Sequence, residues 1–162
     1  MVHPKALALS KTGSRPQVND DAALINTEQG IYVICDGVSE GGNGKHASDY
    51  VSKFIQTKLM EGNQYLEKNG AQLLGAKRLQ YMQEWILSAF TQTQENLLEL
   101  GKSNANYKQA ATTCIAVWIN GRFAILAHIG DRRAYLARAG KVYQLTRDHS
   151  GLDELVKMGM DP

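Results

Sequence analysis

The sequence predicts an α+β fold, and three observations support this prediction. Short apolar runs typical of strands come first, two long segments with helical periodicity follow, and strand-like runs then return. Strands and helices therefore do not alternate as they would in a parallel sheet. With 162 residues, 43% of them hydrophobic, the chain has the size of one ordinary domain. Neither a repeat nor a linker divides residues 1–162, which we expect to form a single domain.

Three short strands are predicted in the first part of the chain. Apolar residues dominate 6–10, 22–26 and 31–35, and the mostly polar residues 27–30 indicate a turn between the last two runs. The third run stops at Asp36, which a glycine follows. The sequence thus places a carboxylate at the end of a buried strand.

Two helices are predicted next. The first begins near Ala47 and should end at Gly62, and the second should end at Gly101, because glycine is common just past a helix C-terminus. Residues 63–75 fit neither pattern clearly. The apolar faces comprise Ala47, Val51, Phe54, Ile55 and Leu59 in the first helix and Leu79, Met82, Ile86, Phe90, Leu97 and Leu100 in the second.

Strands are predicted again after a polar loop. The runs 112–119 and 123–128 are joined by Asn120 and Gly121, a hairpin signal in which both positions favour positive φ.

Two more runs, 134–137 and 142–145, flank a turn at 138–141. Four consecutive strands with tight turns predict an antiparallel meander, and residues 151–158 suggest a short final helix.

Composition excludes several classes of function. The formal net charge is only +2 and the basic residues are scattered, which argues against a nucleic-acid surface. No apolar stretch reaches the roughly 20 residues that span a bilayer, and we expect no secretory signal because the apolar segment near Met1 is short. Cys35 and Cys114 lie in apolar runs, where buried free thiols are favoured over a disulfide. We therefore expect a cytoplasmic protein.

Acidic residues collect where apolar runs end: Asp20 with Asp21, then Asp36, Asp131 and Asp148. Hard divalent cations such as Mg²⁺ and Mn²⁺ prefer oxygen ligands, and a carboxylate at a strand end is rigid yet faces solvent. Each position alone also has a structural explanation, because Asp is common in turns and at helix caps. Taken together and in order, the acids are more specific.

The ordered motifs resemble those of the metal-dependent protein phosphatases, the PPM or type 2C serine/threonine family. The resemblance covers about residues 7 to 160. It rests on Arg15-x-x-x-Asn19-Asp20-Asp21, Asp36-Gly37-Val38, Gly44-x-x-Ala47-Ser48, Ala111-Thr112-Thr113, Ile129-Gly130-Asp131-Arg132-Arg133-Ala134-Tyr135-Leu136 and Gln144-Leu145-Thr146-Arg147-Asp148-His149-Ser150.

The resemblance implies a fold of two antiparallel β-sheets sandwiched between helical layers. It also implies a phosphoprotein substrate and a metal site with two Mg²⁺ or Mn²⁺ ions. Asp36 would bridge the ions, and the Gly37 carbonyl would help to hold one of them. Asp20 would support that ion through water, with Asp21 behind it.

Other roles also follow from the resemblance. Arg15 would grip the substrate phosphate, Asp148 would belong to a weaker third metal site, and Asp131 would be mainly structural. A water bound between the metals would attack phosphorus in line. No cysteine nucleophile is needed, so Cys35 is interpreted as strand packing.

The sequence departs from the family in several places. Asp20 replaces the usual Glu, and Arg132 replaces a usual Ser. Gly41 stands where the family has the histidine that is its usual candidate general acid. His46 lies nearby in sequence, and either a catalytic or a capping and packing role is open for it.

The family's catalytic domain also continues past this point, through aspartates that complete the first metal site. Nothing in 150–162 replaces them convincingly, and Asp153 and Asp161 are expected at the surface or in capping roles. We therefore expect the chain to be a C-terminally truncated version of the family domain, either a fragment of a longer protein or a reduced relative that has lost part of its site. By itself it is expected to be inactive or very poor as a phosphatase and to self-associate through exposed sheet edges. Two functions stay open: a serine/threonine phosphatase module, or a non-catalytic phosphatase-like domain that binds a partner.

Overall fold

The computed structural model describes residues 5–12, 18–38 and 43–149. Along the chain these residues form β1 (Asp21–Asn26), β2 (Ile31–Gly37), α1 (Gly44–Asn69), α2 (Ala76–Ser103), the short 3-10 helix η2 (Ala105–Tyr107), β3 (Thr112–Asn120), β4 (Phe123–Ile129), β5 (Tyr135–Arg138) and β6 (Lys141–Gln144). The predicted α+β class with antiparallel sheets is confirmed.

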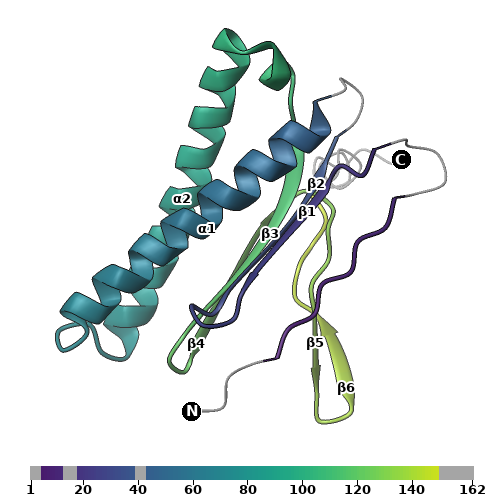
Figure 1. The fold of residues 1–162 in the computed structure, drawn as a ribbon. Helices are drawn as coiled ribbons and strands as arrows, with labels where there is room; N and C mark the ends of the chain where they lie inside the picture. Colours follow the sequence, from purple (N-terminus) through teal and green to yellow (C-terminus); the bar gives the residue numbers. More distant parts are fainter. Residues whose placement is uncertain (1–4, 13–17, 39–42, 150–162) are drawn as a thin grey trace, which may run out of the picture.

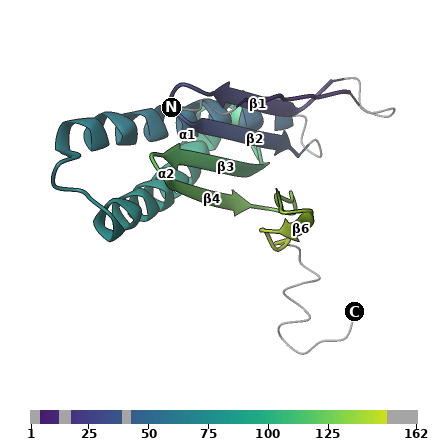
Figure 2. The ribbon, with the colours of Figure 1, turned by 90° about the horizontal axis from the view of Figure 1, so that it is seen from below.

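The strands form two separate sheets. The larger has the order β1-β2-β3-β4, and the smaller is the hairpin β5–β6. Every pairing is antiparallel. The helices cover one face of the larger sheet, and the hairpin lies beyond the end of β4 (Figures 1 and 2). The predicted four-stranded meander is therefore wrong, because among the described residues β5 and β6 pair with each other and not with β4.

Strand β2 is an inner strand that pairs with β1 and β3, and its side chains alternate between the two faces of the sheet. Ile31, Val33 and Cys35 are fully buried, whereas Ile34 and Asp36 retain contact with solvent. Burying one large aliphatic side chain stabilises the fold by about 1.5–3 kcal/mol. The helix-facing side of β2 is therefore held firmly, and the opposite side is left to present Asp36.

The first helix does not end at Gly62 as predicted, because tertiary packing requires glycine there. A Cβ at Gly62 would lie 2.8 Å from the Trp118 ring and 2.9 Å from the Trp85 ring. The missing side chain allows α1 to approach both rings. The helix therefore continues to Asn69, through the first part of the segment that the sequence left undecided.

The second helix likewise passes Gly101 and ends at Ser103. The backbone N–H of Asn104 donates to the Leu100 carbonyl at 2.8 Å and closes the last turn. The predicted polar loop after this helix contains η2. Glycine near the end of a periodic segment is thus not enough to mark a helix terminus in this chain.

The β3–β4 hairpin turns at Gly121 and Arg122 instead of Asn120 and Gly121. Asn120 pairs with Phe123 in the ladder, and Gly121 alone has the predicted positive φ, 62°. Of the other predicted elements, residues 6–10 form no strand, and the expected helix at 151–158 lies outside the described residues.

Cys35 and Cys114 are directly opposed across β2 and β3, and both are buried free thiols, as predicted. The hydrogen bond between the two thiols, together with burial, raises the pKa of Cys35 far above its ordinary value. Such thiols are unreactive. None of the helices in the described ranges is long and apolar enough to cross a membrane.

Candidate functional site

The end of β2 opens into a cavity of about 350 Å³ that contains the carboxylate singled out by the sequence. Four segments distant in the sequence meet there: the end of β2, the start of β3, the connection that follows β4, and the segment that follows β6. The lining residues are Asp36, Gly37, Val38, Thr113, Gly130, Asp131, Arg132 and His149.

Close backbone packing holds the end of β2 in place. A Cβ at Gly37 would lie 2.1 Å from the carbonyl oxygen of Gly44, so glycine is required for α1 to begin against the strand. The N–H of Gly37 donates to the Asp20 carbonyl at 3.2 Å, and the N–H of Val38 donates to the Ala111 carbonyl at 2.8 Å. The Asp-Gly and Gly-x-x-Ala-Ser motifs are thus neighbours in space.

The Asn-Asp-Asp motif lies beside the same strand end. Asp21 is directly opposite Asp36 in the β1–β2 ladder. The Asn19 side chain accepts a hydrogen bond from the Asp21 N–H at 2.9 Å, and the Ser10 hydroxyl donates to the Asp21 carboxylate at 2.9 Å. These contacts order the turn that brings Asp20 next to Gly37.

Arg132 forms an ion pair with Asp36 through Nη2 and Oδ2. Its Nε also lies 3.8 Å from an Asp131 carboxylate oxygen. Asp36 is directly opposite Thr113 in the β2–β3 ladder, so its backbone position is set by pairing on both sides. The cavity therefore holds two carboxylates and one guanidinium, of which sequence analysis had assigned only Asp36 to the chemistry.

Asp148 is engaged by Arg133. Arg133 donates to both carboxylate oxygens, from Nη2 at 2.7 Å and from Nε at 2.9 and 3.2 Å. These hydrogen bonds lower the pKa of Asp148 below its ordinary value. The preceding Thr146 is buried and accepts the Ala134 N–H at 3.0 Å, which joins the Leu-Thr-x-Asp-His motif to the start of β5.

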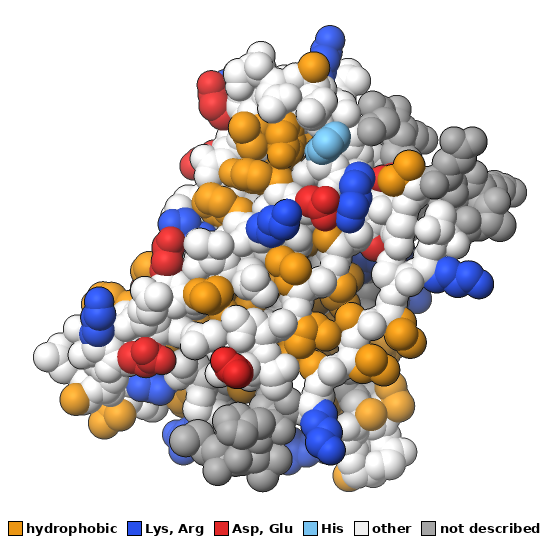
Figure 3. Space-filling model, viewed as in Figure 1, with side chains coloured by type: hydrophobic (Ala, Val, Ile, Leu, Met, Phe, Trp, Pro, Cys, Tyr) orange, Lys and Arg blue, Asp and Glu red, His pale blue; other side chains and the backbone are white. Residues whose placement is uncertain are grey.

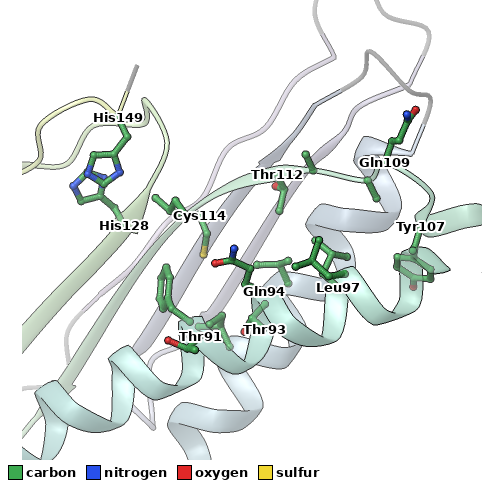
Figure 4. Close-up of a pocket in the computed structure, with 18 of the residues that line it drawn as sticks. Thr91, Thr93, Gln94, Leu97, Tyr107, Gln109, Thr112, Cys114, His128 and His149 are labelled. Atoms are coloured by element: carbon green, nitrogen blue, oxygen red, sulfur yellow. The ribbon is translucent and has the colours of Figure 1, made fainter. Parts of the chain in front are cut away.

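Two histidines that sequence reasoning missed stack against each other beside the cavity. The His128 and His149 rings have centroids 4.5 Å apart and planes inclined by 16°. Burial is the main cause that lowers the pKa of His128, and the nearby His149 lowers this pKa further. His149 lines the cavity and also a larger apolar cleft of about 960 Å³ between α2 and β3, in which Cys114 lies (Figure 4). No local sequence pattern indicated this pairing.

His46, the other histidine considered, is exposed and lies away from the cavity. His46 lies at the start of α1, and its ring centroid is 5.9 Å from that of Tyr107. The packing interpretation of His46 thus has a partner in the structure. Arg15, Gly41, Asp153 and Asp161 lie outside the described residues.

The donor set fits a hard cation in kind. Asp36 and Asp131 provide carboxylate oxygens. The carboxylate of Asp36 is already paired with a positive charge, the guanidinium of Arg132. Oxygen ligands are those that Mg²⁺ and Mn²⁺ prefer. Within residues 5–12, 18–38 and 43–149, however, no group of three or more His, Cys, Asp or Glu could hold a metal ion.

Comparison with known proteins gives the family that the sequence motifs resemble. Residues 12–154 match the family model described as protein phosphatase 2C. A putative protein phosphatase 2C-type of Streptococcus pyogenes is 29% identical over 134 residues, which are 83% of this chain and 50% of that protein. The chain covers 50% of the length of that protein and 29% of the length of a probable protein phosphatase 2C of Arabidopsis thaliana, to which it is also 29% identical.

Solved structures give the same result. The serine/threonine phosphatase Stp1 from Staphylococcus aureus aligns with a TM-score of 0.73 at 26% identity, over 94% of this chain and 57% of that one. The catalytic domain of the serine/threonine protein phosphatase PstP, solved in complex with two manganese ions, aligns with a TM-score of 0.63 at 22% identity, over 94% and 59%. The second likeness establishes the fold alone.

Proposed function

The chain belongs to the protein phosphatase 2C family, and we propose on that premise that it is a Mg²⁺- or Mn²⁺-dependent phosphatase module for phosphoserine and phosphothreonine in proteins. The observation that carries the proposal is the carboxylate of Asp36, at the rigid end of β2, facing a cavity that it shares with Asp131. We place the protein in the cytoplasm, where the thiols of Cys35 and Cys114 stay reduced.

The proposed metal ligands lie around the end of β2. Asp36 would bridge two ions, the Gly37 carbonyl would contribute to one of them, and Asp20 would act through water with Asp21 behind it. Bound cations would activate a water as the nucleophile and neutralise the negative charge that develops on the phosphoryl group. The close contact of Gly37 with Gly44 and the ladder partners of Asp36 keep these oxygens in fixed positions.

Two further roles belong to the same proposal. Arg15 would bind the substrate phosphate, because the planar guanidinium can donate to two phosphate oxygens at once. Asp148 would contribute to a third, weaker metal site. A cation there would have to compete with the bidentate hydrogen bonds that Arg133 donates to Asp148.

A second function is favoured by a specific observation. The described residues supply no cluster of three metal ligands, and a guanidinium is paired with Asp36. A phosphatase-like domain that binds a phosphoprotein or regulatory partner without hydrolysing it would need no complete metal site. The presence or absence of hydrolysis separates these two functions.

Hydrolysis of a phosphothreonine peptide with and without millimolar Mn²⁺ tests the proposal. In a protein that carries the complete family domain, we expect metal-dependent turnover that Asp36→Asn reduces to background, because that change removes the bridging charge. Asp49→Asn is a matched control, since Asp49 pairs with Lys45 on α1 and does not line the cavity. Arg15→Ala should raise KM with little change in melting temperature.

The possible results of this assay distinguish the assignment of Asp36 from the choice between the two functions. Turnover by Asp36→Asn equal to that of the wild type would contradict the assignment of Asp36. Phosphopeptide binding without any metal-dependent hydrolysis would favour the non-catalytic function.

A further inference from the structure

Arg132 places a permanent positive charge on the carboxylate that the proposed function assigns to metal binding. The ion pair joins Arg132 Nη2 to Asp36 Oδ2. An arginine side chain stays protonated at any pH at which the protein is folded.

The side chains of Asp36 and Arg132 differ in how strongly their surroundings hold them in place. The Asp36 side chain is only 26% exposed, and its backbone pairs with Asp21 on one side and Thr113 on the other. The Arg132 side chain is 48% exposed and comes from the connection between β4 and β5. The carboxylate is therefore the fixed partner, and the guanidinium can leave without losing much burial.

A second carboxylate is available to receive the guanidinium. Asp131 lies 3.8 Å from Arg132 Nε, and its side chain is 58% exposed. Movement of Arg132 from Asp36 toward Asp131 would keep the arginine paired in a solvated position. The structure shows Asp36 covered by Arg132, and this movement would give a second arrangement of the same three charges in which Asp36 is open.

We infer that Arg132 is a tethered cation that competes with Mg²⁺ or Mn²⁺ for Asp36 and so lowers the metal affinity of the site. The inference rests on the proposed function, because it concerns the metal site of that function. A divalent ion and a guanidinium repel each other at contact distance, so metal binding at Asp36 requires the guanidinium to leave. Arg132 then acts as a positioning residue that sets the cation concentration at which the site fills.

Calorimetric titration of Mn²⁺ into the 162-residue chain tests the inference. Arg132→Ser should bind Mn²⁺ about fivefold more tightly than the wild type, equivalent to about 1 kcal/mol, because an ion pair of this exposure contributes on that scale. Arg132→Lys retains the charge and should stay close to the wild type. Arg122→Ser is the matched control, since this substitution removes the same charge from the β3–β4 turn. Arg122 lies over the Phe123 ring there.

Thermal unfolding gives a second readout that needs no turnover. Mn²⁺ should raise the melting temperature of Arg132→Ser more than that of the wild type or Arg122→Ser, because tighter binding to the native state adds stability. Circular dichroism establishes that each variant is folded before titration. The ordering of the variants should be the same in both measurements.

The overturning outcomes are distinct from failure of the proposed function. Equal Mn²⁺ affinity for the wild type, Arg132→Ser and Arg122→Ser, or no binding by any of them, would overturn the competition by Arg132. Equal binding by the wild type and Asp36→Asn would show that Mn²⁺ binds elsewhere, which overturns the metal site of the proposed function and the inference with it. Tighter binding by Arg132→Ser that Asp36→Asn abolishes supports both.

Discussion

At the scale of single residues, the contact between Arg133 and Asp148 has a measurable pH dependence. The hydrogen bonds from Arg133 hold the pKa of Asp148 below its ordinary value of 3.8. The folded state therefore binds the proton of this carboxyl less readily than the unfolded chain does. Stability from the pair is complete above pH 3.8 and disappears as the pH falls through the lowered pKa.

We predict that Arg133→Ala returns the pKa of Asp148 toward its ordinary value, because the charged form loses its donors. Carboxyl-carbon NMR between pH 2 and 6 measures this pKa directly. Arg138→Ala removes the same charge from β5 and should leave Asp148 unchanged. A pKa for Asp148 that is the same in the wild type and in Arg133→Ala would show that the contact does not persist in solution.

At the scale of the elements, one buried amide joins α1 to the sheet. The Asn63 oxygen accepts hydrogen bonds from the Trp118 indole at 2.8 Å and from the Asn120 amide at 2.9 Å. Its nitrogen donates to the Gln29 carbonyl at 2.7 Å. A single helical side chain therefore satisfies groups from β3 and from the β1–β2 turn, next to the close approach of Gly62 to the Trp118 ring.

Asn63→Ala should destabilise the protein by about 3 kcal/mol, because it leaves the buried Trp118 N–H and the Gln29 carbonyl without their partner. Urea unfolding followed by tryptophan fluorescence measures the change. The neighbouring variant Gln64→Ala serves as the control, since Gln64 is exposed on the same helix. A loss below about 0.5 kcal/mol for Asn63→Ala, the range of ordinary surface changes, would contradict the proposed link between helix and sheet.

At the scale of the whole molecule, the described residues cover one face of the larger sheet and leave the other face largely open. The helices pack against one side, and the Ile34 and Ile25 side chains on the other side are 52% and 39% exposed. Apolar side chains gather beside the sheet on the side away from the helices (Figure 3). Strands β1 and β4 are the edges of the larger sheet. Exposed apolar surface and open strand edges favour association.

We predict that the 162-residue chain self-associates through this sheet, so that light scattering gives a mass that rises with concentration. Ile34→Lys should shift the distribution toward the monomer, because it places a charge in the centre of the open face. Leu74→Lys is the control, since Leu74 is exposed between the two helices. A monomeric wild type at all concentrations would refute the prediction.

The sequence by itself determined the features that depend on local patterns. Short apolar runs located β1, β2, β3 and β4 to within a residue or two, because the residues of a buried strand are mostly apolar. The abrupt end of the buried run located Asp36 at a strand terminus. The ordered motifs were sufficient to indicate the family.

Only the tertiary structure decided what these elements meet. Gly62 does not end its helix, because the space of its missing side chain is filled by Trp118 and Trp85. Strands β5 and β6 leave the main sheet and pair with each other, although their local pattern is the same as that of β3 and β4. Periodicity describes one element at a time and cannot decide between such arrangements.

The features of the candidate site also fall into two groups, those that the sequence indicated and those that only the structure showed. Asp36, Gly37 and the turn at Asp20 were indicated by residues adjacent in the sequence, and the structure brings them together. The pairing of Arg132 with Asp36 joins two segments that are far apart along the chain. Its physical basis is the register of β2, β3 and β4, which brings the connection after β4 to the end of β2, and that register depends on the packing of the whole sheet against the helices.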